Sequence, residues 1–226
     1  MKKLILSFFA LAIVTIYSCS GLKNMAYSLT EKDAAAAIRQ LLQFGSREGL
    51  DPSAFSRQAL MQRIIPGELQ TPVRLLQTVG LTGELDKMMG TVETAATKTA
   101  ERSIPIFEQT ITRMNIHDAM RLVKQGGTSA TDYLRMHAGD SLRRAIQPVM
   151  QEALATYKAD KYWEAVKKPL QSVLGSNFNP DLATIMSAFV TEVMFNKIAE
   201  KEKQVRADAS ARQTELLQKV FSKDWN

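Results

Sequence analysis

The chain has 226 residues, a formal net charge of +6 at pH 7 and 45% hydrophobic residues, a composition that fits one globular domain or two small ones. Its basic residues are dispersed among acidic ones and only 7% of residues are aromatic, so we expect no nucleic-acid partner. A single cysteine excludes an intramolecular disulfide, and the fold must therefore be stabilised by packing.

The N-terminus has the pattern of an export signal. Lys2 and Lys3 precede the mostly apolar run Leu4 to Ile16, which is followed by small and polar residues. The run is shorter than the roughly 20 residues that a membrane-spanning helix needs. We therefore expect residues 1–18 to be a signal peptide that is removed.

Residues 16–19, Ile-Tyr-Ser-Cys, resemble the lipid-attachment site of bacterial lipoproteins. The resemblance implies a diacylglycerol thioether on Cys19 and an N-terminal acyl chain, and several acyl chains together give stable membrane anchoring. Residues 19–29 would then be a lipidated tether, and the membrane would be a partner through Cys19. The alternative is an ordinary secreted protein with a free thiol.

The expected localisation is the outer membrane, facing the periplasm. By analogy with lipoprotein sorting, Ser20 and Gly21 carry no acidic signal for retention at the inner membrane. The mild positive charge supports at most a weak attraction to an anionic membrane surface.

The first half of the mature chain is predicted to form four helices. Ala, Ile and Leu recur at helical spacing after Thr30, which with Asp33 predicts an N-terminal cap, and this helix is expected to end before Gly45. Pro52 and Pro72 mark the starts of two further short helices. A fourth helix is indicated by an inward stripe rich in Met and Ala between residues 85 and 96.

Prolines and glycines are predicted to divide the second half of the mature chain into separate helices. Pro105 is predicted to interrupt or kink a helix, and Asn115 with Asp118 is predicted to cap the next one, which ends at Gly126. Further helices are expected from residue 128 with a bend at Pro148, over 158–175, from a cap at 179 to about 205, and over roughly 210–221.

No stretch alternates polar and apolar residues between turn signals, which argues against strands. The predicted fold class is all-α, a compact multi-helix bundle of about eight to ten helices with no β-sheet. Residues 30–226 are expected to form a single all-α domain.

Four segments carry a family resemblance: LTEKDAAAAIRQLL, IPGELQ, the run from Ile104 to Arg135, and the run from Ile198 to Ser222. They resemble the bacterial domain of unknown function 4197 family over most of residues 29–223. The resemblance implies an exported helical protein, frequently a lipoprotein, and brings no activity, cofactor or catalytic residue. It does not extend to His137, because the family has other residue types there. The most specific matches are Pro105, Phe107, Asp118, Ala119, Gly126, Gly127, Ala130, Thr131, Asp132, Tyr133 and Arg135.

The segment GGTSATDYLRMHAGDSLRR, Gly126 to Arg144, holds the most suggestive side chains. Gly126 and Gly127 could cradle a phosphate at a helix N-terminus, but the lysine and the strand of a P-loop are missing. We favour a corner at which Gly126 ends one helix and Thr128 caps the next.

The candidate ligand or partner site is Thr131, Asp132, Tyr133, Arg135 and His137. Arg135 could hold an anionic group together with Tyr133 and Thr131. The four-residue spacing of Ser129, Tyr133, His137 and Ser141 predicts a polar track on the buried face of the helix, where His137 could transfer a proton. No carboxylate lies on that track to orient the imidazole, so we favour a structural role.

The remaining charges are assigned to exposed helix faces. Asp132 with Arg135 and Asp140 with Arg144 are spaced for pairing, and the EKEKQVR run after Ala199 is predicted to be a solvated face. No spacing of His and carboxylates matches a metal site, so we expect neither a metal nor a cofactor, and assign no catalytic residue.

The function favoured by the sequence is a lipid-anchored envelope protein that acts as a protein-interaction or structural module, with an envelope protein as a possible partner. The alternative is a binder of a small anionic or lipidic ligand near the Gly126–Arg135 corner, in a groove lined by Met88, Met89, Phe107 and Tyr133. A hydrolase or acid/base enzyme using His137 comes third. The oligomeric state stays open.

Overall fold

A computed structural model describes residues 28–48, 52–64, 82–175, 177, 179, 181–223 and 225. The predicted signal peptide, Cys19, most of the tether and the predicted helix after Pro72 lie outside the described residues.

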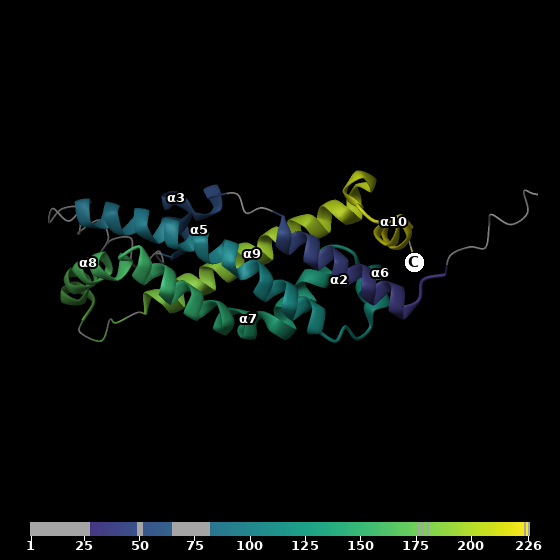
Figure 1. The fold of residues 1–226 in the computed structure, drawn as a ribbon, viewed down its shortest axis with the longest axis horizontal. Coiled ribbons are helices and arrows are strands. Elements are labelled where there is room, and N and C mark those ends of the chain that lie inside the picture. The colour runs from purple at the N-terminus through teal and green to yellow at the C-terminus, as the bar shows by residue number, and fades with distance from the viewer. Residues whose placement is uncertain are drawn as a thin grey trace, which may run out of the picture.

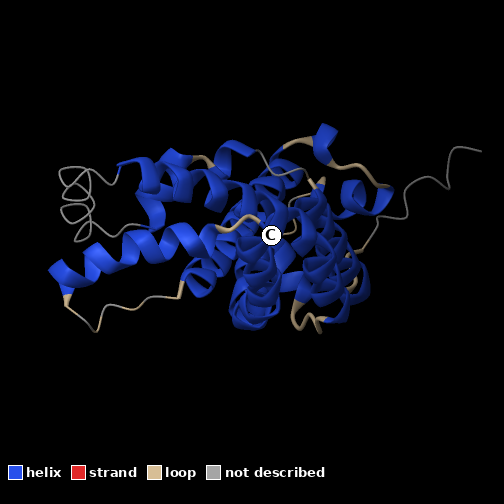
Figure 2. Cartoon of the chain, turned by 60° about the vertical axis from the view of Figure 1, so that its left-hand side comes forward, coloured by secondary structure: helices blue, strands red, loops and turns tan. Residues whose placement is uncertain are grey.

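Within the described residues all regular structure is helical, which confirms the all-α prediction (Figure 2). The elements in chain order are α2 (Glu31–Arg47), the 3₁₀ turn η1 (Pro52–Phe55), α3 (Arg57–Ile64), α5 (Thr82–Arg113), α6 (Ala119–Gln125), α7 (Ser129–Thr156), α8 (Ala159–Leu174), α9 (Leu182–Ala207), the 3₁₀ turn η3 (Ala209–Ala211) and α10 (Glu215–Phe221).

Local caps begin three of these helices. The amide of Asp33 donates to Thr30 Oγ1 at 3.1 Å, which confirms the predicted start of α2. Helix α9 is capped by Asp181 instead of the predicted residue 179. Helix α10 begins later than predicted, at Glu215, because the amide of Leu217 donates to the hydroxyl of Thr214.

Pro105 was predicted to interrupt or kink the helix, and the interruption does not occur, because α5 runs through the proline as one continuous helix; the kink stays a prediction. Pro105 lies on the exposed face of α5, so the carbonyl that loses its hydrogen-bond donor is on the solvated side of the helix. Ala100 and Phe107, before and after the proline, are both fully buried. The burial of both flanking segments against one core keeps the helix continuous.

The helices form an elongated bundle around α9 (Figure 1). Helix α9 packs against α7 and α2, and α5 packs against α7 and α8. At one end of the long axis lie α8 and the start of α5, and at the other lie the start of α2, α6 and α10. Helix α7 has 28 residues and spans roughly 42 Å along this axis.

Helix α9 is long and apolar enough to cross a membrane, the one such helix in the described part of the chain. Because 61% of its most apolar 18-residue segment is buried inside the fold, we interpret α9 as the core helix of the bundle.

Helices α2 and α9 cross at Gly45. A Cβ atom on Gly45 would lie 2.8 Å from the Cα atom of Ile198, so only glycine fits between the two backbones. The prediction that the first helix ends before Gly45 is therefore wrong: the helix continues to Arg47, and Gly45 serves helix packing.

Candidate functional site

The glycine pair forms the corner between α6 and α7, as predicted. Gly126 ends α6 with φ 70° and Gly127 follows with φ 60°, conformations that favour glycine. Thr128 precedes α7, but its side chain does not cap the helix. Its hydroxyl donates to the carboxylate of Asp132 at 2.8 Å.

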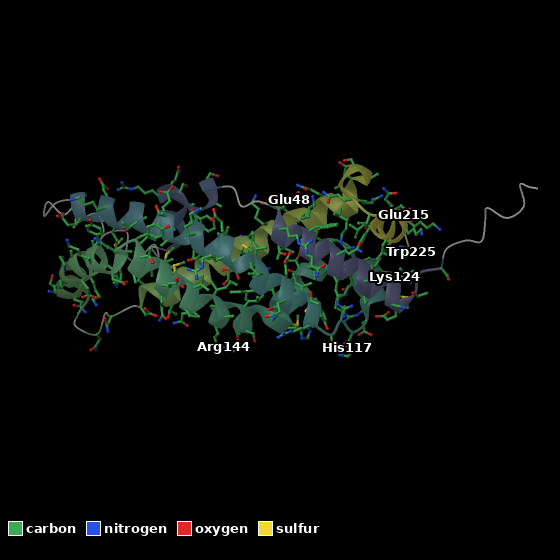
Figure 3. The ribbon with its side chains drawn as sticks, in the orientation of Figure 1. Glu48, His117, Lys124, Arg144, Glu215 and Trp225 are labelled. Atoms are coloured by element: carbon green, nitrogen blue, oxygen red, sulfur yellow. The ribbon has the colours of Figure 1, made fainter. Side chains whose placement is uncertain are left out.

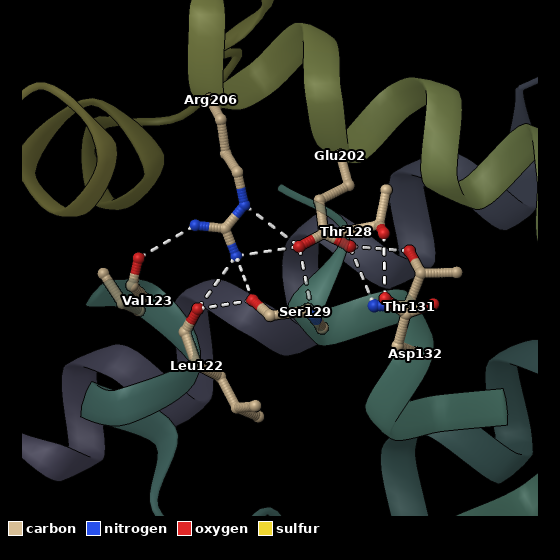
Figure 4. Close-up of polar contacts among 9 residues, drawn as sticks. Leu122, Val123, Thr128, Ser129, Thr131, Asp132, Glu202 and Arg206 are labelled. Atoms are coloured by element: carbon tan, nitrogen blue, oxygen red, sulfur yellow. Dashed lines mark hydrogen bonds and ion pairs between the residues drawn. The ribbon is translucent and has the colours of Figure 1, made fainter. Parts of the chain in front are cut away.

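The cap of α7 comes from Glu202 on α9 (Figure 4). The amides of Ala130 and Thr131 donate to the two oxygens of this carboxylate at 3.0 and 2.8 Å, and the Thr131 hydroxyl adds a bond of 2.6 Å. Glu202 is fully buried. The anion at this helix N-terminus is thus a side chain of the protein itself.

Arg206 neutralises Glu202 and binds the end of α6. Its guanidinium donates to Glu202 at 2.8 and 3.0 Å and to the carbonyls of Val123 and Leu122 at 2.9 and 3.0 Å (Figure 4). The same guanidinium lies over the Phe221 ring at 5.0 Å. One ion pair on α9 therefore satisfies backbone groups on both sides of the corner and contacts α10.

Glu202 and Arg206 contradict the prediction that EKEKQVR is a solvated face. Lys201 and Glu202 are both buried, and Lys201 Nζ donates to Glu48 at 2.6 Å. The sequence signal for this burial is the spacing, because residues 201, 202 and 205 continue the buried stripe that includes Ile198.

The structure places Thr131, Asp132 and Arg135 in internal contacts. Thr131 is fully buried against Glu202. Arg135 pairs with Asp132 at 3.4 Å, as predicted, and with Glu192 of α9 at 3.3 Å. Its guanidinium also lies 4.9 Å from the centre of the Phe195 ring.

Tyr133 forms hydrogen bonds with the loop between α5 and α6. Its hydroxyl donates to the carbonyl of Asn115 at 3.0 Å and accepts from the amide of His117 at 3.3 Å. The ring of His137 lies 4.2 Å from the Tyr133 ring, centre to centre.

The predicted buried track along α7 is wrong, because His137 and Ser141 are exposed. Each step of four residues rotates the side chain by roughly 40° about the helix axis. A track that begins at the half-buried Ser129 therefore turns toward solvent within three steps. The helix buries Leu134, Leu142 and Ile146 instead.

Of the two predicted pairings, the one between Asp140 and Arg144 is wrong. Asp140 pairs with Arg143, one residue closer than expected, and Arg144 Nη2 lies 3.5 Å from the Ser141 hydroxyl.

Helix α6 is likewise capped from a distant residue, and not by Asn115 and Asp118. Asp118 has a left-handed backbone with φ 54° and makes no capping bond. The amides of Ala119 and Met120 donate to the carboxylate of Glu31 on α2, at 3.2 Å for Met120.

The predicted ligand groove is wrong as well. Met88, Met89 and Phe107 are core residues, and Phe107 packs edge-on against Phe195 with 5.5 Å between ring centres. Tyr133 belongs to the α5–α6 loop contact described above.

An open cleft of about 400 Å³ lies between the end of α7, α8 and the start of α9. Trp163 contributes an indole, Asp160 and Glu164 contribute carboxylates from α8, and Lys167 pairs with Glu164. The lining residues are Gln151, Leu154, Asp160, Trp163, Glu164, Lys167, Asn179, Asp181, Leu182 and Ala183.

Asp181 adds a third carboxylate to this cleft. The hydrogen bond from the Thr184 hydroxyl, helped by the amides of Thr184 and Ala183, lowers the pKa of Asp181 below its ordinary value. The cleft thus carries three carboxylates and one ammonium group in a protein of net positive charge.

A smaller hollow of about 290 Å³ is lined by Phe44, Arg47, Glu48, Lys201 and Gln213. Across the described ranges, no group of three or more His, Cys, Asp or Glu side chains is arranged to hold a metal ion.

Comparison with known proteins gives one match. The model of a family described as protein of unknown function (DUF4197) matches residues 28–222. No curated protein and no solved structure matches the chain.

Proposed function

The chain belongs to the DUF4197 family of proteins of unknown function, and we propose that it is a lipid-anchored envelope protein that binds a partner through the cleft between α7, α8 and α9. The helical domain is a binding module in this proposal, with Cys19 as the lipid attachment site.

The observation that carries the proposal is the position of the cleft. The described chain begins beside α6 and α10, and the cleft lies at the α8 end of the long axis (Figure 1). Helix α7 separates the two ends by roughly 42 Å. An anchor at one end would leave the cleft open toward the periplasm.

The lining of the cleft indicates the chemistry of the partner. Carboxylates outnumber the one lysine, and Asp160 has no basic partner among the described residues. Trp163 offers an aromatic face on which an arginine or lysine side chain can stack. A segment with basic side chains is the partner that such a cleft fits.

The helix corner offers less to a ligand. The amides of Ala130 and Thr131 are taken by Glu202, and Arg135 is paired with two carboxylates. The alternative of an anionic ligand at Gly126–Arg135 would require Glu202 to leave the helix N-terminus.

Substitution of the lipid-attachment cysteine tests the anchor. Cys19→Ala should move the protein from the membrane fraction to a soluble fraction, or leave an uncleaved precursor. If the mature, correctly cleaved variant still pellets with membranes, the anchor proposal is wrong.

A basic peptide tests the cleft. The chain has two tryptophans, so Trp225→Phe leaves Trp163 as the fluorescent reporter. Titration with tri-arginine should give a saturable change in Trp163 emission, whereas tri-glutamate should not. Asp160→Asn together with Glu164→Gln should weaken tri-arginine binding roughly tenfold, since charge-assisted hydrogen bonds are lost.

The matched control is Glu101→Gln together with Glu200→Gln, which neutralises two exposed carboxylates outside the cleft that pair with Lys98 and Lys197. It should leave tri-arginine binding unchanged. Equal weakening by both sets of variants would show that the peptide responds to net charge and would contradict a specific cleft.

A further inference from the structure

We propose that the end of the molecule at which α2 begins docks on an anionic phospholipid surface. The docking surface is the exposed set Lys32, Met120, Arg121, Lys124 and Lys223, called the tether-end patch below. This inference rests on the proposed lipid anchor, which brings the patch to the membrane, and it assigns a membrane role to the folded domain itself.

Helix α6 forms the centre of the patch. Its inner face, with Leu122 and Val123, is buried in the core. Its outer face exposes Met120, Arg121 and Lys124, and Met120 is one of the two large apolar side chains that the described residues expose. A short helix with an exposed apolar residue beside two cations suits the interface of an anionic bilayer.

The chain leading to the anchor enters beside this helix. Leu29 packs against the core, and Glu31 holds the amides of Ala119 and Met120. Lys32 follows directly in the first turn of α2 and is exposed. The start of α2 and the N-terminal end of α6 are therefore held together by a specific contact.

Arg206 places the C-terminal segment on the same side. Its guanidinium binds the carbonyl of Val123, immediately before Lys124, and lies over the ring of Phe221, two residues before Lys223. Figure 3 shows Lys124 and Trp225 at the same end of the molecule. The indole of Trp225 is held there by a 2.7 Å hydrogen bond to the carbonyl of Val220.

The charges of the patch are available to phospholipids. Lys32, Lys124 and Lys223 have no carboxylate partner among the described residues, and Arg121 makes an exposed contact of 3.6 Å with Asp118. Of the other carboxylates at this end, Glu215 contacts Lys219 and Asp33 faces the positive end of α2. Lysines near an anionic surface each contribute to attraction.

Because of the tether, a weak electrostatic attraction between the tether-end patch and the bilayer is sufficient for docking. The ten residues from Ser20 to Leu29 can span at most about 35 Å. An anchored Cys19 therefore keeps the patch at a high effective concentration near the bilayer, and a few cations can then orient the domain.

The two tryptophans give a direct test, because Trp225 lies at the tether end and Trp163 in the cleft at the α8 end. Full-length lipidated protein is reconstituted in phosphatidylethanolamine–phosphatidylglycerol vesicles that contain a phospholipid with a nitroxide on its head group. Trp163→Phe reports on Trp225, and Trp225→Phe reports on Trp163. We expect quenching of Trp225 and little quenching of Trp163, and we expect the difference to disappear in uncharged phosphatidylcholine vesicles.

Charge-reversal variants test whether the residues of the tether-end patch are the ones that dock on the bilayer. Each cation lost should shift the ratio of docked to undocked protein about fivefold. Arg121→Glu with Lys124→Glu should therefore abolish the selective quenching of Trp225. Arg121→Gln with Lys124→Gln is a milder second pair, and thermal unfolding checks that both pairs fold. Lys87→Glu with Lys168→Glu, exposed positions near the α8 end, is the control of equal charge and should keep the quenching.

Two failures can be told apart. Protein that pellets with the anionic vesicles but shows equal quenching of both tryptophans overturns the docking alone. Selective quenching that survives both patch variants also overturns it. Protein that carries no lipid and does not pellet overturns the proposed anchor, and the docking with it.

Discussion

The backbone nitrogen of Thr131 lies 2.8 Å from Glu202 Oε2, although 71 positions separate the two residues in the chain. Through this contact α9 supplies the N-terminal cap of α7, and Arg206, one turn further along α9, supplies the cap for the carbonyls of α6. The α6–α7 corner is thus held by one ion pair on the central helix.

Removal of Glu202 should destabilise the fold strongly. Glu202→Ala leaves Arg206 without its carboxylate and two amides without an acceptor, and breaking a buried ion pair costs about 3–5 kcal/mol. The free energy of unfolding from urea denaturation measures the loss. Glu200→Ala, two residues earlier, removes an exposed contact with Lys197 and should change the same quantity by less than about 1 kcal/mol.

Equal effects of Glu202→Ala and Glu200→Ala would mean that Glu202 is not the buried cap of α7.

Two glycine substitutions should change the stability of the fold in opposite directions. Gly45→Ala forces a methyl group against the backbone of Ile198, and overpacking of this kind costs about 1–3 kcal/mol. Gly90→Ala in α5 meets no atom within 4 Å and should stabilise the protein by about 0.5–1 kcal/mol, because alanine is the better helix residue. Thermal melting of both variants checks the prediction, and a stabilised Gly45→Ala protein would refute the close crossing of α2 and α9.

Helix α6 should depend on Glu31. Glu31→Ala removes the acceptor for the amides of Ala119 and Met120, and loss of a helix cap costs about 1 kcal/mol. Hydrogen exchange of α6 amides should become faster, while exchange in α8 should stay the same. Lys32→Ala, the neighbouring exposed residue, is the control and should leave α6 unchanged.

The cap of α9 should give a pH-dependent contribution to stability. Because hydrogen bonds from Thr184 hold the pKa of Asp181 below its unfolded value, this contribution is complete above about pH 4 and is lost as the pH falls through the folded-state pKa. Asp181→Asn keeps a good N-cap residue without the titration. The difference in unfolding free energy between wild type and variant should therefore shrink below pH 4, and a constant difference from pH 7 to pH 3 would contradict the assignment.

The fold class and the two features named next were predictable because they depend on neighbouring residues, and the family was predictable from the resemblance of four segments. Thr30 with Asp33 begins α2, and Gly126 with Gly127 forms the corner, as the sequence indicates. The caps of α6 and α7 were not predictable from local patterns, because Glu31 and Glu202 act on residues 71 or more positions away. The predicted interruption at Pro105 fails for the same reason, since tertiary packing keeps α5 continuous.

Within the candidate site, residue types were easier to identify than their surroundings. Asp132 and Arg135 pair as expected. His137 faces solvent, because side chains spaced four residues apart rotate progressively about the helix axis and so turn away from the core. The cleft around Trp163 could not be predicted, because it is formed by three helices that meet only in the folded structure.

The proposed lipid anchor is tested most sharply by the intact mass of the protein purified from the membrane fraction. We predict a chain that begins at Cys19 and carries a diacylglycerol group and an additional acyl chain. A soluble mature chain with an unmodified Cys19 thiol would contradict it.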